Sequence, residues 1–229
     1  MQVIKPVTTI LNEDYKKQLA AAEYQLILSP HDELSNKIRQ IRADFQETYQ
    51  ATSVPGGKAN LTLVRFTQLT MMEERIVQRL RTIALGFCPF KVELKDFGSL
   101  PVHSIFINVT SKLPIRGLVK EIRQIQRLMR LDKDHKPHFI DEPNLLIARQ
   151  LQPWQFEKGW LEYADRAFTG RFIADAMLLL RRRTTGIFSD GPRSRRDSPI
   201  SGGWQIIGRF EFHNLPVNTR QGELFTSQR

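Results

Sequence analysis

The chain has 229 residues, 41% of them hydrophobic and 25% charged, which is enough for a folded core and an ordinary composition for a globular protein. Its 34 lysine and arginine residues against 24 aspartate and glutamate residues give a formal net charge of +10, which favours polyanionic partners such as RNA, nucleotides or phosphate esters. No segment approaches the ~18 consecutive apolar residues of a membrane span, and the single cysteine, Cys88, excludes an internal disulfide framework, so we expect a cytoplasmic protein without a membrane partner.

The first half of the chain predicts alternating strands and helices. A mixed N-terminal arm with a short helix near 12–22 precedes a strand at Tyr24–Leu28. Apolar residues at helical spacing then predict a helix over 34–49, which ends before the glycines that separate it from a strand at Asn60–Phe66. A second amphipathic helix follows over about Thr70–Leu85.

The second half shows a similar order. Alternation predicts strands at Phe90–Phe97 and His103–Thr110, and an apolar stripe predicts a helix over about 113–131. A loop that contains His135 and His138 leads to a strand at Asn144–Arg149. The order strand, helix, loop and Asn-Leu-x-aliphatic strand thus occurs twice, which indicates an internal repeat of two similar lobes.

The last third predicts a helix over about Pro153–Ala164 and strands at about Arg171–Arg182 and Trp204–His213. Between these strands, residues 183–203 are rich in Arg, Ser, Gly and Pro, which is typical of a long mobile loop. Residues 216–229 are expected to form a flexible tail.

The two Asn-Leu-x-aliphatic strands carry the strongest functional signal. Because side chains of a strand alternate between its faces, Asn60 and Thr62 share one face, as do Asn144 and Leu146. By the same alternation Arg65 and Arg149 are expected on the opposite faces, where they pair with acidic residues.

These strands resemble the paired His-x-Thr strands of the 2H phosphoesterase superfamily, which includes the 2′-5′ RNA ligase-like proteins. The resemblance extends over much of the chain, because Tyr24–Pro30 with its following helix looks like the family's opening, and 177–183 and 204–212 look like the closing strands of bacterial members. It implies an α+β fold with two pseudo-symmetric lobes, each an antiparallel sheet with helices packed on the outside, around a central groove. It also implies a single bilobal domain over 1–229.

In that family one histidine acts as general base and the other as general acid on a 2′,3′-cyclic or 2′-5′ phosphodiester, and the hydroxyl groups hold phosphate oxygens. Here Asn60 and Asn144 stand at the histidine positions and Leu146 at the second hydroxyl position, so only Thr62 is kept. Asparagine does not titrate in the working range, so the motif positions lack proton-transfer groups. The resemblance therefore implies a pseudoenzyme without confident catalytic residues, whose vestigial groove binds RNA ends, a nucleotide or another phosphate ester without turnover.

The predicted ligand-binding residues combine the motif positions with nearby basic and polar groups, and no metal or cofactor is expected. They are Asn60, Thr62, Asn144, His103, Arg181 and Arg183. Two basic clusters accompany them: a stripe on the helix over 113–131 (Arg116, Lys120, Arg123, Arg127 and Arg130) and a group around the long loop (Arg181, Arg182, Arg183, Arg193, Arg195 and Arg196), with Phe188 and Trp204 as possible stacking groups for RNA bases.

Two alternatives remain open. In the first, the chain is an active phosphodiesterase or RNA ligase that uses other groups such as His103 or His138. His138 is a candidate because Pro137-His138-x-aliphatic also resembles a histidine motif. Alternatively it is a protein-interaction scaffold that docks a partner through its arginine-rich loop. His135 and His138 form a His-x-x-His spacing, which without a third ligand is a weak metal signal.

Overall fold

A computed structural model of the chain describes residues 20–183 and 203–215. Most of the predicted helix at 12–22, almost all of the arginine-rich loop and the tail at 216–229 lie outside these residues. The same is true of Phe188, Arg193, Arg195 and Arg196.

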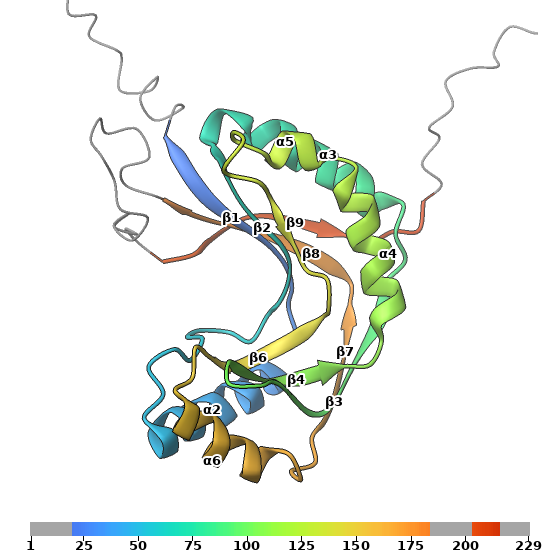
Figure 1. The fold of residues 1–229 in the computed structure, drawn as a ribbon. Helices are drawn as coiled ribbons and strands as arrows, with labels where there is room; N and C mark the ends of the chain where they lie inside the picture. Colours follow the sequence, from blue (N-terminus) through green and yellow to red (C-terminus); the bar gives the residue numbers. More distant parts are fainter. Residues whose placement is uncertain (1–19, 184–202, 216–229) are drawn as a thin grey trace, which may run out of the picture.

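Two antiparallel sheets form the framework of the molecule (Figure 1). Sheet A has five strands in the order β5-β2-β1-β8-β9 and sheet B has four in the order β6-β4-β3-β7. The strands of sheet A are β1 (Ala21–Leu28), β2 (Leu61–Leu69), β5 (His138–Phe139), β8 (Ala176–Arg183) and β9 (Gln205–Glu211). Those of sheet B are β3 (Phe90–Leu100), β4 (Ser104–Val109), β6 (Asn144–Arg149) and β7 (Thr169–Ala174).

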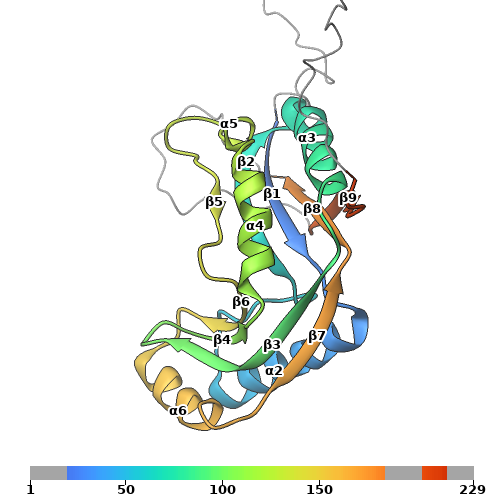
Figure 2. The ribbon, with the colours of Figure 1, turned by 90° about the vertical axis from the view of Figure 1, so that its right-hand side faces the viewer.

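The helices cover the outer faces of the sheets and leave the inner faces turned toward each other (Figures 1 and 2). Sheet B carries α2 (Asp32–Tyr49) and α6 (Pro153–Tyr163), while α3 (Glu73–Leu85), α4 (Lys112–Arg123) and the short α5 (Gln126–Met129) lie beside sheet A, with the 3₁₀ turn η1 (Thr70–Met72) before α3. The predicted fold class, an α+β protein with two lobes around a central groove, is therefore confirmed.

The two repeated units exchange their helices. Strands β1 and β2 belong to sheet A, but the helix between them, α2, contacts β6 and β7 of sheet B. In the second unit β4 and β6 belong to sheet B, while α4 lies beside α3 next to sheet A. Each lobe therefore contains pieces of both halves of the sequence, and neither half has a complete core of its own.

Aromatic side chains fill the core of each lobe. Tyr24 and Phe66 stack on the outer face of sheet A, with ring centroids 5.1 Å apart. Behind sheet B, the Tyr163 ring contacts Phe45 at 5.4 Å and Phe97 at 4.9 Å. Offset and edge-on ring pairs of this kind add to the stabilisation from burial alone.

The structure corrects several predicted boundaries. The predicted strand over 171–182 is two strands, β7 and β8, which belong to different sheets and meet at Asp175. The predicted helix over 113–131 is interrupted after Arg123, and α5 is a separate turn. The loop before β6 contains the two-residue strand β5, which pairs with the edge of β2.

Candidate functional site

Both motif strands contain a β-bulge at the corresponding position, and the bulges decide which side chains reach the inner faces. In β2, Leu26 pairs with Val64 but Ile27 pairs with Thr62, so Leu63 is an extra residue. In β6, Phe106 pairs with Leu146 but Ile105 pairs with Ala148, so Ile147 is an extra residue. A bulge places two successive residues opposite one and changes the alternation of the side chains that follow.

The bulges turn Arg65 and Arg149 toward the inner faces. Leu63 and Val64 are both buried, and so are Ile147 and Ala148, which shows that both extra residues join the core. Arg65 pairs in register with Gln25, and Arg149 with Ser104 on the face that also carries Phe106. The prediction that these arginines lie on the faces opposite the motif side chains is therefore wrong, because simple alternation does not allow for the extra residue.

Arg65 lies in a polar network on sheet A. With its amide oxygen turned toward Arg65, Gln25 accepts hydrogen bonds from Nε and Nη2 at 2.9 Å each, and Glu23 lies 3.8 Å from Nε. Burial lowers the pKa of Arg65, the charges of Arg149 and Arg182 lower it further, and Glu23 opposes these effects. Arg65 and Arg149, which we call the arginine pair, are thus close enough to repel each other.

The charge of the arginine pair is only partly compensated. Glu23 already accepts a hydrogen bond from Arg182 at 2.5 Å, and the guanidinium of Arg182 lies 4.5 Å from the centre of the Trp204 ring. Within the described residues the Arg149 side chain has no ion pair or hydrogen bond, although its backbone N–H donates to the Ser53 carbonyl at 3.1 Å. Arg65 and Arg182 thus share the carboxylate of Glu23, and Arg149 adds a further positive charge nearby, an arrangement that favours a bound anion.

A buried arginine supports the second bulge from behind. Arg42 of α2 is only 5% exposed, and its Nε and Nη2 donate to the carbonyl oxygen of Leu146 at 3.0 and 2.7 Å. Burial lowers the pKa of Arg42 to about 10. The bulge frees the Leu146 carbonyl from regular strand pairing, and the two hydrogen bonds satisfy it.

The motif side chains have different hydrogen-bonding states. Asn144 Nδ2 donates to the Glu142 carbonyl at 3.1 Å, so this amide caps the turn before β6. The Oδ1 atom of Asn60 is buried without a partner, and among the described residues Thr62 makes no side-chain hydrogen bond. A buried polar atom without a partner in a folded protein calls for an explanation, and a ligand is one of the few available.

The remaining predicted ligand-binding residues do not join this group. Arg181 pairs in register with Tyr24 on the outer face of sheet A, and its Nη1 lies 3.0 Å from an oxygen of Glu73. Arg183 follows two residues later, beside Ala22. His103 is exposed in the turn between β3 and β4 rather than in a strand.

His138 is the histidine that the structure brings beside the arginine pair. It pairs in register with Arg65 across the edge of sheet A, so its side chain leaves the same face of the sheet. The neighbouring His135 is instead held by Asp132, at 2.8 Å from Nδ1 to a carboxylate oxygen. The described residues contain no cluster of three or more metal-ligating side chains.

Sequence reasoning missed Gln25 and Phe106 in addition to the arginine pair. Phe106 is half-buried on the inner face of sheet B and pairs with Leu146, and opposite it Gly98 leaves room for its ring. A Cβ atom at Gly98 would lie 2.6 Å from both Phe106 Cε2 and Asn108 Oδ1. Phe106 and Leu146 thus form an apolar surface on the inner face of sheet B, the face that also carries Arg149.

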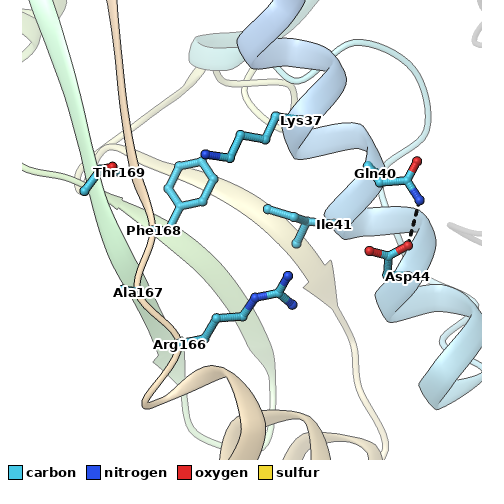
Figure 3. Close-up of a pocket in the computed structure, with 8 residues that line it drawn as sticks. All are labelled: Lys37, Gln40, Ile41, Asp44, Arg166, Ala167, Phe168 and Thr169. Atoms are coloured by element: carbon cyan, nitrogen blue, oxygen red, sulfur yellow. Dashed lines mark hydrogen bonds between the residues drawn. The ribbon is translucent and has the colours of Figure 1, made fainter.

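A hollow of about 460 Å³ on the opposite side of sheet B is a weaker candidate (Figure 3). It lies between α2 and the segment that leads into β7, away from the motif strands. Its two cations already have partners: Lys37 Nζ lies 4.9 Å from the centre of the Phe168 ring, and Arg166 lies over Tyr163 at 5.2 Å.

The fold is similar to that of solved phosphoesterase structures. It matches E. coli LigT in its apo form with a TM-score of 0.54 and 12% sequence identity, over 84% of this chain and 98% of that chain. The complex of E. coli LigT with 3′-AMP gives a TM-score of 0.53 at the same identity and coverage. A further structure described as a phosphoesterase gives 0.51 at 12% identity, over 83% of this chain and 98% of that chain.

No protein-family model and no curated protein sequence matches the chain. No helix within residues 20–183 and 203–215 is long and apolar enough to cross a membrane. At such low identity the solved structures establish the fold alone. The chain has the bilobal fold of E. coli LigT, a 2H phosphoesterase.

Proposed function

We propose that this chain is a catalytically degenerate relative of the 2H phosphoesterases that binds a nucleotide or another phosphate ester in its central groove without turnover. The observation that carries the proposal is the arginine pair, which two bulges turn inward from opposite lobes and which the neighbouring carboxylate only partly neutralises. Planar guanidinium groups bind phosphate oxygens in a bidentate manner, so such a pair suits a phosphate group.

The groups around the arginine pair support a nucleotide rather than phosphate alone. The apolar surface of Phe106 and Leu146 lies on the same face of sheet B as Arg149 and can pack against a base. The Thr62 hydroxyl group, on the inner face of sheet A, has no hydrogen-bond partner within residues 20–183 and 203–215. E. coli LigT, whose fold this chain shares, was crystallised with 3′-AMP and with phosphate, which also favours this ligand class.

The absence of turnover follows from Asn60 and Asn144 at the two motif positions. Removal of one acid or base typically lowers a rate by about 10²–10⁴, and two asparagines provide neither function. The Asn144 amide is also engaged with the Glu142 carbonyl, a structural role that a catalytic group would not have.

A binding experiment tests the first part of the proposal. Thermal unfolding and titration calorimetry with 3′-AMP, inorganic phosphate and adenosine should show stabilisation by the first two ligands and a weaker effect of adenosine. Arg65→Gln/Arg149→Gln should lose the response, whereas Arg75→Gln/Arg81→Gln, two exposed arginines of α3, should keep it. Equal responses of the two double variants would contradict the role of the arginine pair.

A turnover assay tests the second part. Hydrolysis of 2′,3′-cyclic nucleotides and 2′-5′-linked dinucleotides should be undetectable in the wild-type chain. The variant Asn60→His/Asn144→His/Leu146→Thr should gain weak cyclic phosphodiesterase activity, because it restores both proton-transfer groups and the second hydroxyl group. A folded variant of this kind that binds 3′-AMP but shows no activity would mean that the groove cannot align the reaction.

A second candidate function is an active phosphodiesterase that uses His138. Its position beside Arg65 favours this candidate, because it places an imidazole, a group that can accept and donate a proton, next to the arginine pair. Wild-type turnover that His138→Ala abolishes, and that His103→Ala leaves unchanged, would replace the proposal of an inactive protein with this one.

A further inference from the structure

A second basic surface lies just outside the central groove, at the edge of sheet A. Arg123, Arg127, Arg130, Lys136, His138 and Asp141 line a hollow of about 510 Å³ between α4, α5 and the segment that contains β5. We call it the edge hollow. We propose that the edge hollow binds the phosphodiester backbone of a single-stranded nucleic acid whose end occupies the groove, an inference that rests on the proposed function and extends it to an oligonucleotide.

The charge of the edge hollow is poorly compensated. Its walls carry four permanent cations and a single carboxylate, Asp141, which lies 3.2 Å from Arg123 Nη2. Within the described residues neither Arg127 nor Lys136 has an ion pair or a side-chain hydrogen bond. Their positions differ, because Arg127 belongs to α5 and Lys136 to the segment before β5, so two separate elements direct unpaired cations to one hollow.

Two acidic residues of this region, Glu142 and Asp132, have other partners. Glu142 lies 2.8 Å from Lys112 and also pairs with Arg116, which neutralises the start of α4. Asp132 accepts hydrogen bonds from the backbone and ring of His135. The basic stripe predicted on the helix over 113–131 is thus divided, with its first part neutralised and its last part left as the wall of the edge hollow.

The edge hollow adjoins the arginine pair at the edge strand β5. His138 lines the hollow and pairs in register with Arg65, so only the two-residue strand β5 separates the hollow from the arginine pair. Because β5 is the outermost strand of sheet A, no further strand blocks the path. A mononucleotide bound at the arginine pair cannot fill both regions, whereas a polymer with a phosphate at each unit can contact them in succession.

The geometry favours a nucleic acid over an acidic protein. Cations spread along a path from the groove suit evenly spaced phosphates, and flexible basic side chains tolerate any base sequence. Arg123 already covers the Phe139 ring at 4.8 Å, so the hollow offers phosphate contacts rather than a stacking surface.

Fluorescence anisotropy with 5′-labelled oligouridylates of two and eight nucleotides tests the proposal. The wild-type chain should bind the eight-nucleotide RNA more tightly and with a steeper salt dependence than the dinucleotide. Arg127→Ala/Lys136→Ala should weaken binding of the longer RNA and leave the dinucleotide unchanged. Loss of two phosphate contacts should reduce the slope of log affinity against log salt by about 1.4, so that the wild-type chain loses about sevenfold more affinity than the variant between 50 and 200 mM salt.

The charge-matched control is Arg75→Ala/Arg81→Ala on α3, and the unfolding temperature of each variant verifies its fold. If the control weakens the longer RNA as much as Arg127→Ala/Lys136→Ala does, the effect is one of net charge and the proposal is wrong. It is also wrong if oligoglutamate of equal charge displaces the RNA as effectively as unlabelled RNA does.

Binding of 3′-AMP separates the two proposals. If 3′-AMP binds neither the wild-type chain nor any variant, while binding of the longer RNA still depends on Arg127 and Lys136, the groove proposal fails and the edge hollow remains as a nucleic-acid site. If 3′-AMP binds through the arginine pair but affinity does not rise with RNA length, the edge hollow has no role and the groove proposal stands.

Discussion

The two members of the arginine pair occupy corresponding positions but should have opposite effects on stability. Arg65 donates two hydrogen bonds to Gln25 and lies near Glu23, whereas Arg149 has no side-chain partner among the described residues and repels Arg65. We therefore expect Arg149→Gln to stabilise the unliganded chain and Arg65→Gln to destabilise it.

The expected magnitudes follow from exposure and charge. The Arg65 side chain is 46% exposed, so the repulsion is screened, and its removal in Arg149→Gln should stabilise by on the order of 0.5 kcal/mol at low salt. Arg65→Gln removes the same repulsion but loses the hydrogen bonds to Gln25, for a net cost of about 1 kcal/mol. For a chain of this length these values correspond to shifts of roughly 1–2 °C upward and 2–4 °C downward in the unfolding temperature.

Thermal unfolding at 20 mM and 1 M NaCl provides the measurement. At 1 M salt the screening length falls to about 3 Å, so the gain from Arg149→Gln should largely disappear, while the loss from Arg65→Gln should persist in part. With phosphate present at low salt, the wild-type chain should be stabilised more than Arg149→Gln. A lower unfolding temperature of Arg149→Gln at low salt, or a gain that does not change with salt, would refute the electrostatic description of the groove.

Three further predictions concern the scaffold of the site and are measured by urea unfolding. Burial lowers the pKa of Arg42 to about 10, so above that pH the unfolded chain binds more protons than the folded chain. The free energy of unfolding of the wild-type chain, relative to that of Arg42→Met, should therefore rise by about 1 kcal/mol from pH 10 to 11. A constant difference over this range would contradict the burial of a charged group at this position. Gly98→Ala should cost about 1–3 kcal/mol because its Cβ would lie 2.6 Å from Phe106, whereas Gly56→Ala, in open space, should change stability by less than about 0.5 kcal/mol. Gln155→Leu should lower the free energy of unfolding by about 2–4 kcal/mol, because the buried amide donates to two backbone carbonyls at the end of α2 and accepts from the N-cap N–H of α6. A loss below about 1 kcal/mol would mean that water replaces these hydrogen bonds.

Much of the fold was accessible from the sequence because the hydrophobic pattern is regular. Helical spacing predicted α2 and α3, and alternation predicted β3 and β4, with bounds that differ from the observed ones by up to three residues. The interruption of the predicted helix over 113–131 and the short strand β5 could not be predicted from the sequence. The interruption after Arg123 has neither Gly nor Pro to signal it, and β5 is too short to show a period and exists through its pairing with β2.

The sequence predicted which strands form the candidate site but not which side chains of those strands lie on the inner faces. Alternation gave the correct side for Thr62 and the wrong side for Arg65, because an extra residue lies between them. A signal was present: both motif strands contain two successive aliphatic residues followed by arginine, Leu63-Val64-Arg65 and Ile147-Ala148-Arg149. Two adjacent core residues in an otherwise alternating strand indicate a bulge, and their recurrence at the same position in both halves strengthens that indication.

The partners of the two bulges explain why the arginine pair depends on both halves of the chain. The carbonyl of Leu63, in the first bulge, accepts a hydrogen bond from the Ile140 N–H at 2.9 Å, and Ile140 belongs to the second half. The carbonyl of Leu146, beside the second bulge, accepts from Arg42, which belongs to the first half. A bulge is stable only if its freed backbone groups find partners, so each half completes the strand that turns the other half's arginine inward. The direction of Arg65 and Arg149 therefore cannot be predicted from either Asn-Leu-x-aliphatic motif alone. The groups that stabilise the two bulges, Ile140 and Arg42, lie about 75 to 100 residues away in the sequence and contact the bulges only in the folded chain.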